Sequence, residues 1–180
     1  MNIKGEKVVL RAIETGDLNF LRDLHNDPEI ANLIGGWSFP ISMADQEEWY
    51  KKTRIDEHTK RFIIELIDSH EAIGYTGLWD IDWKDRRAYT GIILKRDYWG
   101  KGYGRDSVMT LMHYAFYELG LMRLDSDIIE YNNSSLKLYL ERCGWKKEGI
   151  RRRHIFRNGR FFDRILIGIL REEYEEMLKR

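Results

Sequence analysis

The sequence predicts an α+β fold in which a mixed central β-sheet is flanked by helices, and three features support this. Strand-like segments follow one another at hairpin spacing within residues 61–94. A helix is indicated next, because apolar residues recur at helical spacing within residues 108–119. The turn signal Asn158–Gly159 then joins two further strands. The length of 180 residues fits one domain, which we expect to span residues 1–180.

The first half of the chain is expected to open with a strand at residues 7–13, KVVLRAI. Asp17 to Asn26 is predicted as a short helix that ends near Pro28, because the residue before a proline disfavours the helical conformation. Ser42 is a good N-cap residue and Asp45 follows three positions later, so a second helix is expected to begin there. Three strands follow, with the sequences RFIIELI, AIGYTGLWDI and AYTGIIL.

The second half begins with a helix whose first turn lies near residues 102–105. Its buried face is predicted to consist of Val108, Leu111, Met112, Ala115, Phe116 and Leu119. A strand is expected at residues 121–129, and a short helix from Ser134 to Cys143. The chain closes with a hairpin at residues 154–170. The predicted order of elements is therefore β-α-α-β-β-β-α-β-α-β-β.

Composition and charge exclude several classes of protein. Lysine plus arginine and aspartate plus glutamate both total 30, so a nucleic-acid binder that relies on a broad basic surface is disfavoured. Cys143 is the single cysteine, which excludes an internal disulfide and favours a reducing cytoplasm. The longest uncharged stretch, residues 30–44, is too short to span a bilayer. We expect a cytoplasmic protein without a nucleic-acid partner, a membrane partner or a metal site.

The segment DYWGKGYGRDS, residues 97–107, carries three glycines at alternate positions just before a predicted helix. These glycines are Gly100, Gly102 and Gly104. They form either a flexible turn or a backbone cradle for an anion, which the positive end of the helix would favour. The segment is not a Walker A loop, because no Ser or Thr follows Lys101. It is not a dinucleotide fingerprint either, since Arg105 or Ser107 stands where the last glycine would be needed.

Residues 92–116, IILKRDYWGKGYGRDSVMTLMHYAF, resemble the acetyl-CoA-binding segment of the GNAT N-acetyltransferases. The core motif of that family reads Gln/Arg-x-x-Gly-x-Gly/Ala. Gly102 and Gly104 fill its two small positions, and Trp99 stands where the family usually has Gln or Arg. Downstream, residues 131–149 resemble the second cofactor segment of the family, an Asn that begins a helix ending in Gly-Phe/Trp.

The closing hairpin at residues 154–170 resembles that of the subgroup containing ribosomal-protein alanine and spermidine acetyltransferases. The resemblance implies a sheet that is splayed around a cofactor cleft, between residues 92–94 and residues 123–129. Gly91 is a candidate bulge that starts the splay, or a residue that relieves crowding. The resemblance implies acetyl-CoA as cofactor. The expected cofactor-binding residues are Ile92, Ile93, Leu94, Trp99, Gly100, Lys101, Gly102, Tyr103, Gly104, Arg105, Asn132 and Ser135.

The implied activity is direct transfer of an acetyl group from the thioester to a primary amine. A polyamine, a protein N-terminus and an aminoglycoside-like amine are the acceptors left open, as is a homodimer. The family often uses a tyrosine on the second cofactor helix to protonate the departing thiolate. Counted from Asn132 this residue is Tyr139, but counted back from Gly144–Trp145 the position holds Leu140. Either the helix accommodates one extra residue, or Asn133 is the motif Asn and no tyrosine acid exists.

The acceptor wall is expected at two aromatic stretches that carry nearby carboxylates. Its candidate residues are Trp37, Phe39, Asp80 and Asp82, which suit a cationic amine through cation–π contact and charge pairing. The general base is not identified. Its equal candidates are Asp80, Asp82, Glu130 and His154, and a chain of water molecules is the alternative to them. Two alternative functions stay open, a non-catalytic acyl-CoA sensor of the same fold and a nucleotide-binding protein.

Overall fold

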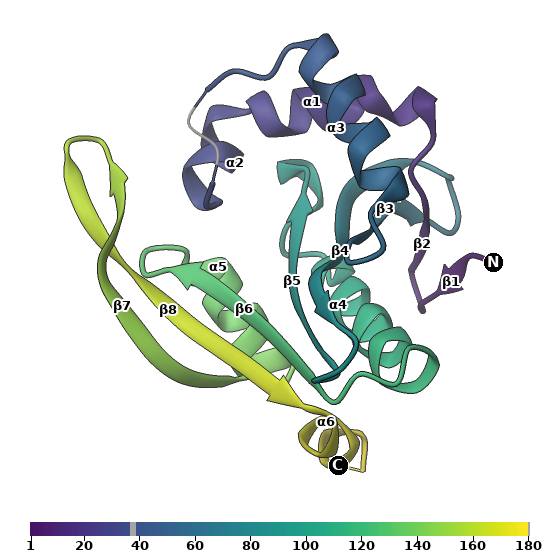
Figure 1. The fold of residues 1–180 in the computed structure, drawn as a ribbon, viewed down its shortest axis with the longest axis vertical. Coiled ribbons are helices and arrows are strands. Elements are labelled where there is room, and N and C mark those ends of the chain that lie inside the picture. Colours follow the sequence, from purple (N-terminus) through teal and green to yellow (C-terminus); the bar gives the residue numbers. More distant parts are fainter. Residues whose placement is uncertain (37–38, 180) are drawn as a thin grey trace.

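The computed structural model describes residues 1–36 and 39–179, which form one eight-stranded mixed sheet (Figure 1). The strands lie in the order β1-β2-β3-β4-β5-β6-β8-β7. They are β1 (Ile3–Lys4), β2 (Val8–Ala12), β3 (Lys60–Leu66), β4 (Ala72–Asp82), β5 (Arg87–Leu94), β6 (Arg123–Ile129), β7 (Lys146–Arg157) and β8 (Arg160–Leu170). Neighbouring strands are antiparallel except β5 and β6, which pair in parallel. The predicted α+β fold class is confirmed.

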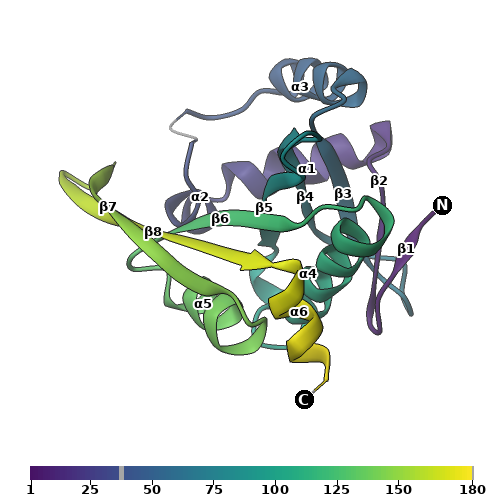
Figure 2. The ribbon, with the colours of Figure 1, turned by 60° about the horizontal axis from the view of Figure 1, so that its bottom comes forward.

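Helices cover both faces of this sheet. They are α1 (Leu18–Asn26), α2 (Pro28–Leu33), α3 (Met43–Ile55), α4 (Tyr103–His113), α5 (Asn133–Leu136) and α6 (Arg171–Leu178). Short 3-10 turns lie at η1 (Thr15–Asp17) and η2 (Arg96–Tyr98), and π-helical turns at η3 (Tyr114–Glu118) and η4 (Lys137–Arg142). Figure 2 shows α1, α2 and α3 on one side of the sheet and α4, α5 and α6 on the other.

Two apolar clusters hold these layers together. The larger lies between the sheet and α4, η4 and α6, and it contains the predicted buried face of α4. Phe116 and Ala115 are fully buried there, and Leu119 packs against the cluster from its edge. The smaller cluster places Leu21 of α1 against Ile63 of β3. These clusters leave the line between β5 and β6 as the place where a cavity can open.

The helix starts follow the expected capping chemistry. Ser42 accepts a hydrogen bond from the N–H of Asp45, and the Asp45 carboxylate accepts one from the Ser42 N–H, which forms a capping box. The predicted helix ends before Pro28, as expected, but α2 begins at Pro28 itself. Proline is tolerated in the first helical turn, where its missing N–H would be unpaired, and Asp27 caps that turn.

The remaining differences from the predicted elements concern short segments and ends. The short strand β1 and the helices α2 and α6 were not predicted, and β7 begins earlier than the predicted hairpin. The predicted helix from Ser134 to Cys143 is divided into α5 and the π-helical segment η4. Among the described residues, no helix has the length and apolar character needed to cross a bilayer.

The sheet splits between β5 and β6. The two strands pair only from Arg87↔Arg123 to Tyr89↔Asp125 and then diverge. At the start of the gap, the Ser126 hydroxyl donates a hydrogen bond of 2.7 Å to the Thr90 carbonyl. The predicted splay is confirmed. Of the two interpretations of Gly91, the bulge is wrong, because Gly91 pairs regularly with Gly77 and the register shift lies further along, between Trp79 and Asp82. The structure favours relief of crowding, since a Cβ on Gly91 would lie 2.9 Å from the Trp79 ring.

Candidate active site

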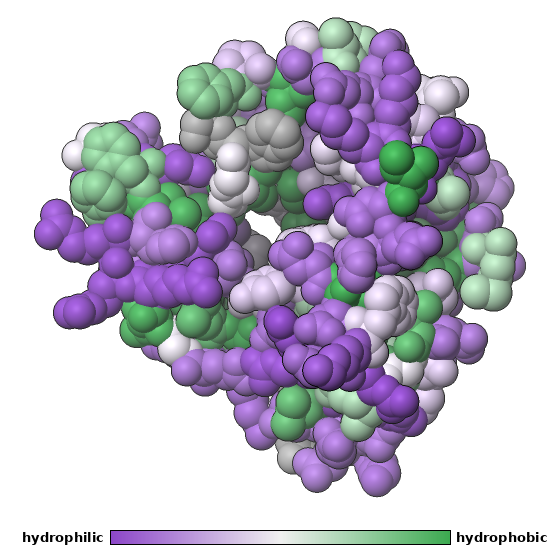
Figure 3. Space-filling model, viewed as in Figure 1, coloured by the Kyte–Doolittle hydropathy of each residue, from purple (hydrophilic) through white to green (hydrophobic). Residues whose placement is uncertain are grey.

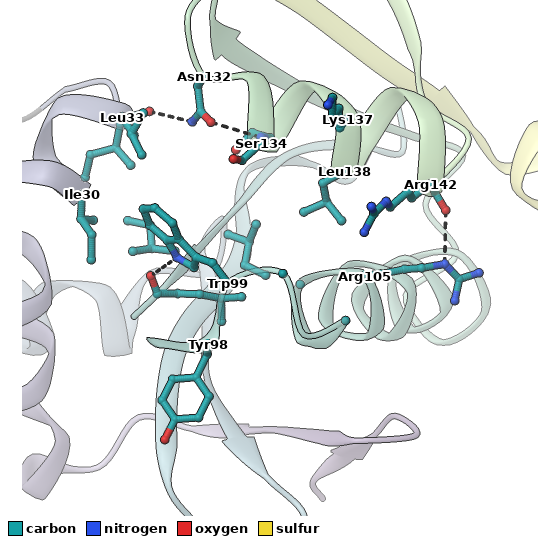
Figure 4. Close-up of a pocket in the computed structure, with 18 residues that line it drawn as sticks. Ile30, Leu33, Tyr98, Trp99, Arg105, Asn132, Ser134, Lys137, Leu138 and Arg142 are labelled. Atoms are coloured by element: carbon teal, nitrogen blue, oxygen red, sulfur yellow. Dashed lines mark hydrogen bonds between the residues drawn. The ribbon is translucent and has the colours of Figure 1, made fainter. Parts of the chain in front are cut away.

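A cavity of about 270 Å³ lies in the gap between β5 and the α5–η4 helix, and we call it the cofactor cleft (Figure 4). Most of the predicted cofactor residues line it, namely Ile92, Ile93, Leu94, Trp99, Gly100, Gly102, Gly104, Arg105, Asn132 and Ser135. Lys101 and Tyr103 do not line it. The Lys101 Nζ lies 5.7 Å from the centre of the Tyr98 ring, and the Tyr103 side chain packs on the core.

The glycine loop forms the end of the cleft at the first turn of α4. Gly100 and Gly102 have φ angles of +74° and +90°, which side-chain-bearing residues rarely adopt. Gly102 is the N-cap of α4, so the unpaired N–H groups of the first helical turn lie directly after it. An added Cβ on Gly104 would make an ordinary contact, 3.4 Å from Leu138 Cδ2 in η4, so a small residue fits this position. The loop therefore presents N–H donors and a positive helix end at the cleft.

Cationic side chains surround this end of the cleft, and sequence reasoning missed three of them. Lys137 and Arg142 line the cleft from η4, and the Nε of Arg105 donates a hydrogen bond of 3.3 Å to the Arg142 carbonyl (Figure 4). The Nζ of Lys7 lies 3.3 Å from the position that a Cβ on Gly102 would take. The sequence separation between Lys7 and the glycine loop hid this contact.

Asp106 explains why Lys7 lies there. Its carboxylate accepts hydrogen bonds from the backbone N–H groups of Glu6, Lys7 and Val8, at 3.0, 2.7 and 3.0 Å. The turn between β1 and β2 is thereby attached to the first turn of α4. The acidic residue that follows the glycines in sequence is thus a structural anchor.

Trp99 points into the cofactor cleft, whereas Tyr98 points away from it (Figure 4). The Trp99 indole N–H donates a hydrogen bond of 2.8 Å to the Leu94 carbonyl. Because strand residues alternate in the side to which their backbone groups point, Leu94 and Ile92 face the cleft and Ile93 faces β4. Ile93, one of the predicted cofactor-binding residues, therefore lines the cleft through its side chain.

Asn132 connects the cleft to its cover. Its Oδ1 accepts from the N–H of Ser135 at 3.1 Å and caps α5, while its Nδ2 donates to the Leu33 carbonyl at 3.2 Å (Figure 4). Three side chains hold the end of helix α2 across the gap by donating hydrogen bonds to its last carbonyls. Tyr131 donates to the carbonyl of Asn32, Asn132 to that of Leu33, and Arg157 to that of Ile34. These bonds satisfy carbonyls that a helix end leaves unpaired.

The π-helical segment η4 accommodates the extra residue found in the sequence. Asn132 is the N-cap of α5, and the wider turn from Lys137 to Arg142 absorbs one residue before Gly144. Tyr139, rather than Leu140, then lines the second cavity described below. The Tyr139 ring is buried edge-on against Trp145, and its hydroxyl has no hydrogen-bond partner among the described residues. Burial raises the pKa of Tyr139, so its hydroxyl stays protonated at neutral pH.

A second cavity, of about 400 Å³, continues from the cofactor cleft across the face of the sheet, and we call it the trough. The two share Ile92, Ile93, Asn132 and Ser135 as lining residues. Two cross-strand pairs of β4 and β5 form side walls of the trough. One pair is Tyr75 and Ile93, the other is Trp79 and Tyr89, and Gly91 lies between the two pairs. In Figure 3 the molecule is hollowed near the centre of the view, where β5 and β6 part in Figure 1.

Charged and polar side chains enter the trough from several strands. Asp127 and Arg164 form an ion pair of 2.6 Å, and burial raises the pKa of Asp127. Tyr75 lies 2.8 Å from Nε2 of His25, whose Nδ1 lies 3.0 Å from the Leu21 carbonyl. Since a carbonyl only accepts, Nδ1 carries the proton and the Tyr75 hydroxyl donates to Nε2. Burial lowers the pKa of His25 and keeps its ring neutral.

Three residues predicted for the acceptor wall, Phe39, Asp80 and Asp82, do not line either cavity, which corrects that expectation. Phe39 is 82% exposed, and Asp80 is exposed at a strand bend where its φ is +51°. Asp82 caps a turn by accepting from the N–H groups of Lys84 and Asp85, at 3.1 and 2.9 Å. Trp37 lies outside the described residues.

Glu130 and His154, the other candidates for the general base, also lie outside the lining of both cavities. The Glu130 carboxylate accepts from the N–H of Asp163 at 2.8 Å, and His154 is exposed on β7. The trough residues that the sequence did not indicate, such as Arg61 and Tyr75, carry no local motif. Only their shared face of the sheet brings them together.

Comparison with known proteins agrees with this geometry. Residues 7–146 match the family model described as "Acetyltransferase (GNAT) domain". The chain is 30% identical to the uncharacterized SPbeta prophage-derived N-acetyltransferase YokL of Bacillus subtilis, over 95% of this chain and 94% of that protein. It is 32% identical to spermidine N(1)-acetyltransferase of Vibrio cholerae, over 93% and 95%.

The crystal structure of a Vibrio cholerae spermidine N-acetyltransferase with CoA and spermine superimposes with a TM-score of 0.88 at 31% identity. The match covers 94% of this chain and 98% of that one. The predicted cofactor, acetyl-CoA, is therefore confirmed, and the sensor and nucleotide-binding alternatives are not favoured. The chain belongs to the GNAT family of N-acetyltransferases, as its sequence motifs indicated.

Proposed function

We propose that this enzyme transfers an acetyl group from acetyl-CoA in the cofactor cleft to a primary amine that enters through the trough. The observation that carries this assignment is the position of Tyr139, which lines the trough beside Asn132 and Ser135, where the two cavities join. A hydroxyl at that junction can reach both the thioester and the amine. The cosubstrate supplies an activated acetyl thioester.

The cofactor cleft would hold the cosubstrate mainly through its backbone. The N–H groups after Gly102 and the side chains of Arg105 and Lys7 suit a pyrophosphate. The Ile92 backbone is free to pair with an amide-bearing arm, as an added strand would. The Leu94 N–H is aimed into the cleft and is the candidate donor to the thioester oxygen.

Tyr139 would hold the proton that the departing thiolate needs. Its raised pKa keeps the hydroxyl protonated, and its lack of a partner among the described residues leaves that hydroxyl free to donate. The acceptor must be a neutral amine when it attacks. The spermidine acetyltransferase relatives make a polyamine the first acceptor to assay, beside a protein N-terminus and an aminoglycoside-like amine. We expect a cytoplasmic location and propose a homodimer as the state to test.

The test is Tyr139→Phe, which keeps the ring against Trp145 and removes only the hydroxyl. We expect turnover in a thiol-release assay to fall by roughly 100-fold, the lower end of the range for general acid catalysis, with unchanged affinity for acetyl-CoA. The matched control is Tyr174→Phe, which removes a buried hydroxyl near His113 and outside both cavities. Wild-type turnover in Tyr139→Phe would reduce Tyr139 to a packing residue.

A further inference from the structure

Arg61 is a half-buried cation at the wall of the trough, and it lacks a carboxylate partner among the described residues. Its Nε is fully buried and makes no hydrogen bond within that same part of the chain. Two other half-buried arginines, by contrast, each pair with a carboxylate. Arg11 lies 2.8 Å from Asp17, and Arg164 lies 2.6 Å from Asp127. A buried charge without an oppositely charged partner is costly, so an anionic ligand group beside Arg61 would be stabilising.

The surroundings of Arg61 hold its guanidinium in one place. Its Cζ lies 5.1 Å from the centre of the Trp79 ring, 5.7 Å from that of Trp49 and 6.0 Å from that of Tyr75. Aromatic faces stabilise the cation and remove water from it, but they leave its N–H edge free for a planar anion. The guanidinium is therefore preorganised for a carboxylate.

Two glycines make room for this arrangement. Arg61, Gly77 and Gly91 lie in one row across β3, β4 and β5. A Cβ on Gly77 would lie 3.1 Å from Arg61 Cγ, and a Cβ on Gly91 would lie 2.9 Å from the Trp79 ring. Both side chains can therefore lie flat over the strands and extend toward the gap between β5 and β6.

The charge balance of the trough points in the same direction. Its charged lining residues within the described chain are Arg61, Asp127 and Arg164. Asp127 and Arg164 neutralise each other, and the neutral His25 behind Tyr75 adds no charge, so one positive charge remains. This field attracts an anionic group and repels a polycation.

We propose that Arg61 is a specificity residue that binds a carboxylate of the acceptor, so that the preferred acceptor is a primary amine that also carries an anionic group. A peptide or amino-acid-like amine fits this description, whereas a polyamine does not. The proposal rests on the proposed function, because it takes the trough as the acceptor site. It adds the substrate class, which neither the family nor the reaction determines.

The experiment uses matched acceptors in a thiol-release assay, with dipeptides that have a free C-terminal carboxylate, the same dipeptides amidated there, and spermidine. The two peptide forms share nearly the same amine. We expect kcat/KM to favour the free acid by roughly 10- to 100-fold, the range of one charge-assisted pair. A preference of the wild-type enzyme for the amide or for spermidine would overturn the proposal.

Arg61→Met then assigns the preference to the guanidinium, because it keeps an unbranched apolar stem against Trp79. We expect the acid-to-amide ratio to fall to about one, with unchanged affinity for acetyl-CoA. Arg61→Lys, which retains the charge and loses the planar fork, should keep part of the preference. The control is Arg153→Met, because Arg153 also stacks on an aromatic ring, 5.4 Å from the centre of Phe161, but lies outside the trough. A preference that survives in Arg61→Met would contradict the assignment.

A binding measurement separates this proposal from the proposed function. If none of the acceptors leads to release of thiol from acetyl-CoA, the proposed function fails for these amines. Calorimetry on the CoA-loaded protein still compares the binding of the acid and amide forms of each dipeptide. Tighter binding of the acid supports the carboxylate site even then. Equal binding, or none, overturns it. If Arg61→Met does not fold, the wild-type ratio and Arg61→Lys decide the question.

Discussion

The cofactor cleft and the trough adjoin each other on the same strand, but they are built in different ways. In the cleft, the groups suited to the cosubstrate are largely backbone groups of the β5 edge at Ile92 and Leu94, the glycine loop and the first turn of α4, and apolar and cationic side chains lie around them. The trough is lined mainly by residues of β3, β4, β5, β6 and β8, with the end of α2 and residues of the α5–η4 helix, among them Tyr139, completing it. A site made of backbone accepts a constant ligand, whereas a site made of side chains can change its ligand by substitution. Under the proposed function, substitutions in the trough would change the acceptor and leave the cosubstrate site intact.

The largest expected effect breaks the cleft at its backbone. In Gly102→Val, a branched side chain meets a φ of +90° and the Nζ of Lys7. We expect the Kd for acetyl-CoA, measured by calorimetry, to rise on the order of 100-fold, because about two charge-assisted hydrogen bonds are lost.

The control for this variant is Gly159→Val. Gly159 has a φ of +79° in the hairpin turn, far from the cleft, and its missing Cβ has no atom within 4 Å. Gly159→Val therefore introduces the same kind of backbone strain as Gly102→Val at a position that does not line the cofactor cleft. Equal loss of acetyl-CoA affinity in both variants would show that strain alone explains the effect.

A smaller effect is expected on the trough from Gly91→Ala. The new methyl group would lie 2.9 Å from the ring of Trp79, which lines the trough and must shift. We expect the free energy of unfolding to fall by about 1–3 kcal/mol, as in overpacked cores, and the KM of the amine to rise. The affinity for acetyl-CoA should stay unchanged.

Gly149→Ala on β7 is the matched control for the trough, since its methyl group would meet Leu166 Cδ1 at an ordinary 3.6 Å. Denaturant unfolding and steady-state kinetics check both variants. Weaker acetyl-CoA binding with an unchanged amine KM in Gly91→Ala would show that the two cavities are not separable in this way.

Asn132→Ala tests the connection between the two regions. It removes the N-cap of α5 and the bond to Leu33, with an expected loss of about 1–2 kcal/mol in stability. Because α2 covers the cleft, we also expect weaker acetyl-CoA binding. Ser42→Ala removes the N-cap of α3 and should lower stability alone. Denaturant unfolding and calorimetry are measured on both variants. If Asn132→Ala and Ser42→Ala bind acetyl-CoA equally well, the position of α2 over the cleft does not affect cofactor binding.

The smallest effect concerns pH and the polar pair behind the trough. Burial lowers the pKa of His25 below its ordinary 6.5. Just below pH 6.5, His25 is therefore protonated in the unfolded chain and still neutral in the folded chain. Stability is thus fully present above about pH 6.5 and is lost as the pH falls through the folded pKa. We expect Tm to decline between about pH 7 and about pH 5, and His25→Gln to flatten that decline.

His70→Gln is the control for the pH experiment, since His70 is exposed and borders Glu65 at the surface. Its Tm profile should follow that of the wild-type protein. An unchanged slope in His25→Gln would assign the decline to other groups.

Much of the fold was predictable because its signals are local. The capping pair Ser42 and Asp45, the turn at Asn158–Gly159 and the apolar spacing of α4 each act within a few residues. The missed helix α2 shows the limit of such signals. From the residues before it, Pro28 indicates the end of a helix. It indicates the beginning of another helix only once Asp27 is seen to cap that helix.

The sequence by itself determined the family, the cosubstrate and the glycine loop, because backbone sites need glycines and helix starts at fixed spacing. Tertiary structure alone decided the register of Tyr139, since a π-helical turn is a matter of packing over several residues. It also decided the trough, which Arg61 and Asp127 line together although they lie far apart in the chain. Side chains on adjacent strands meet through register and splay, and no local spacing in a sequence encodes either of these.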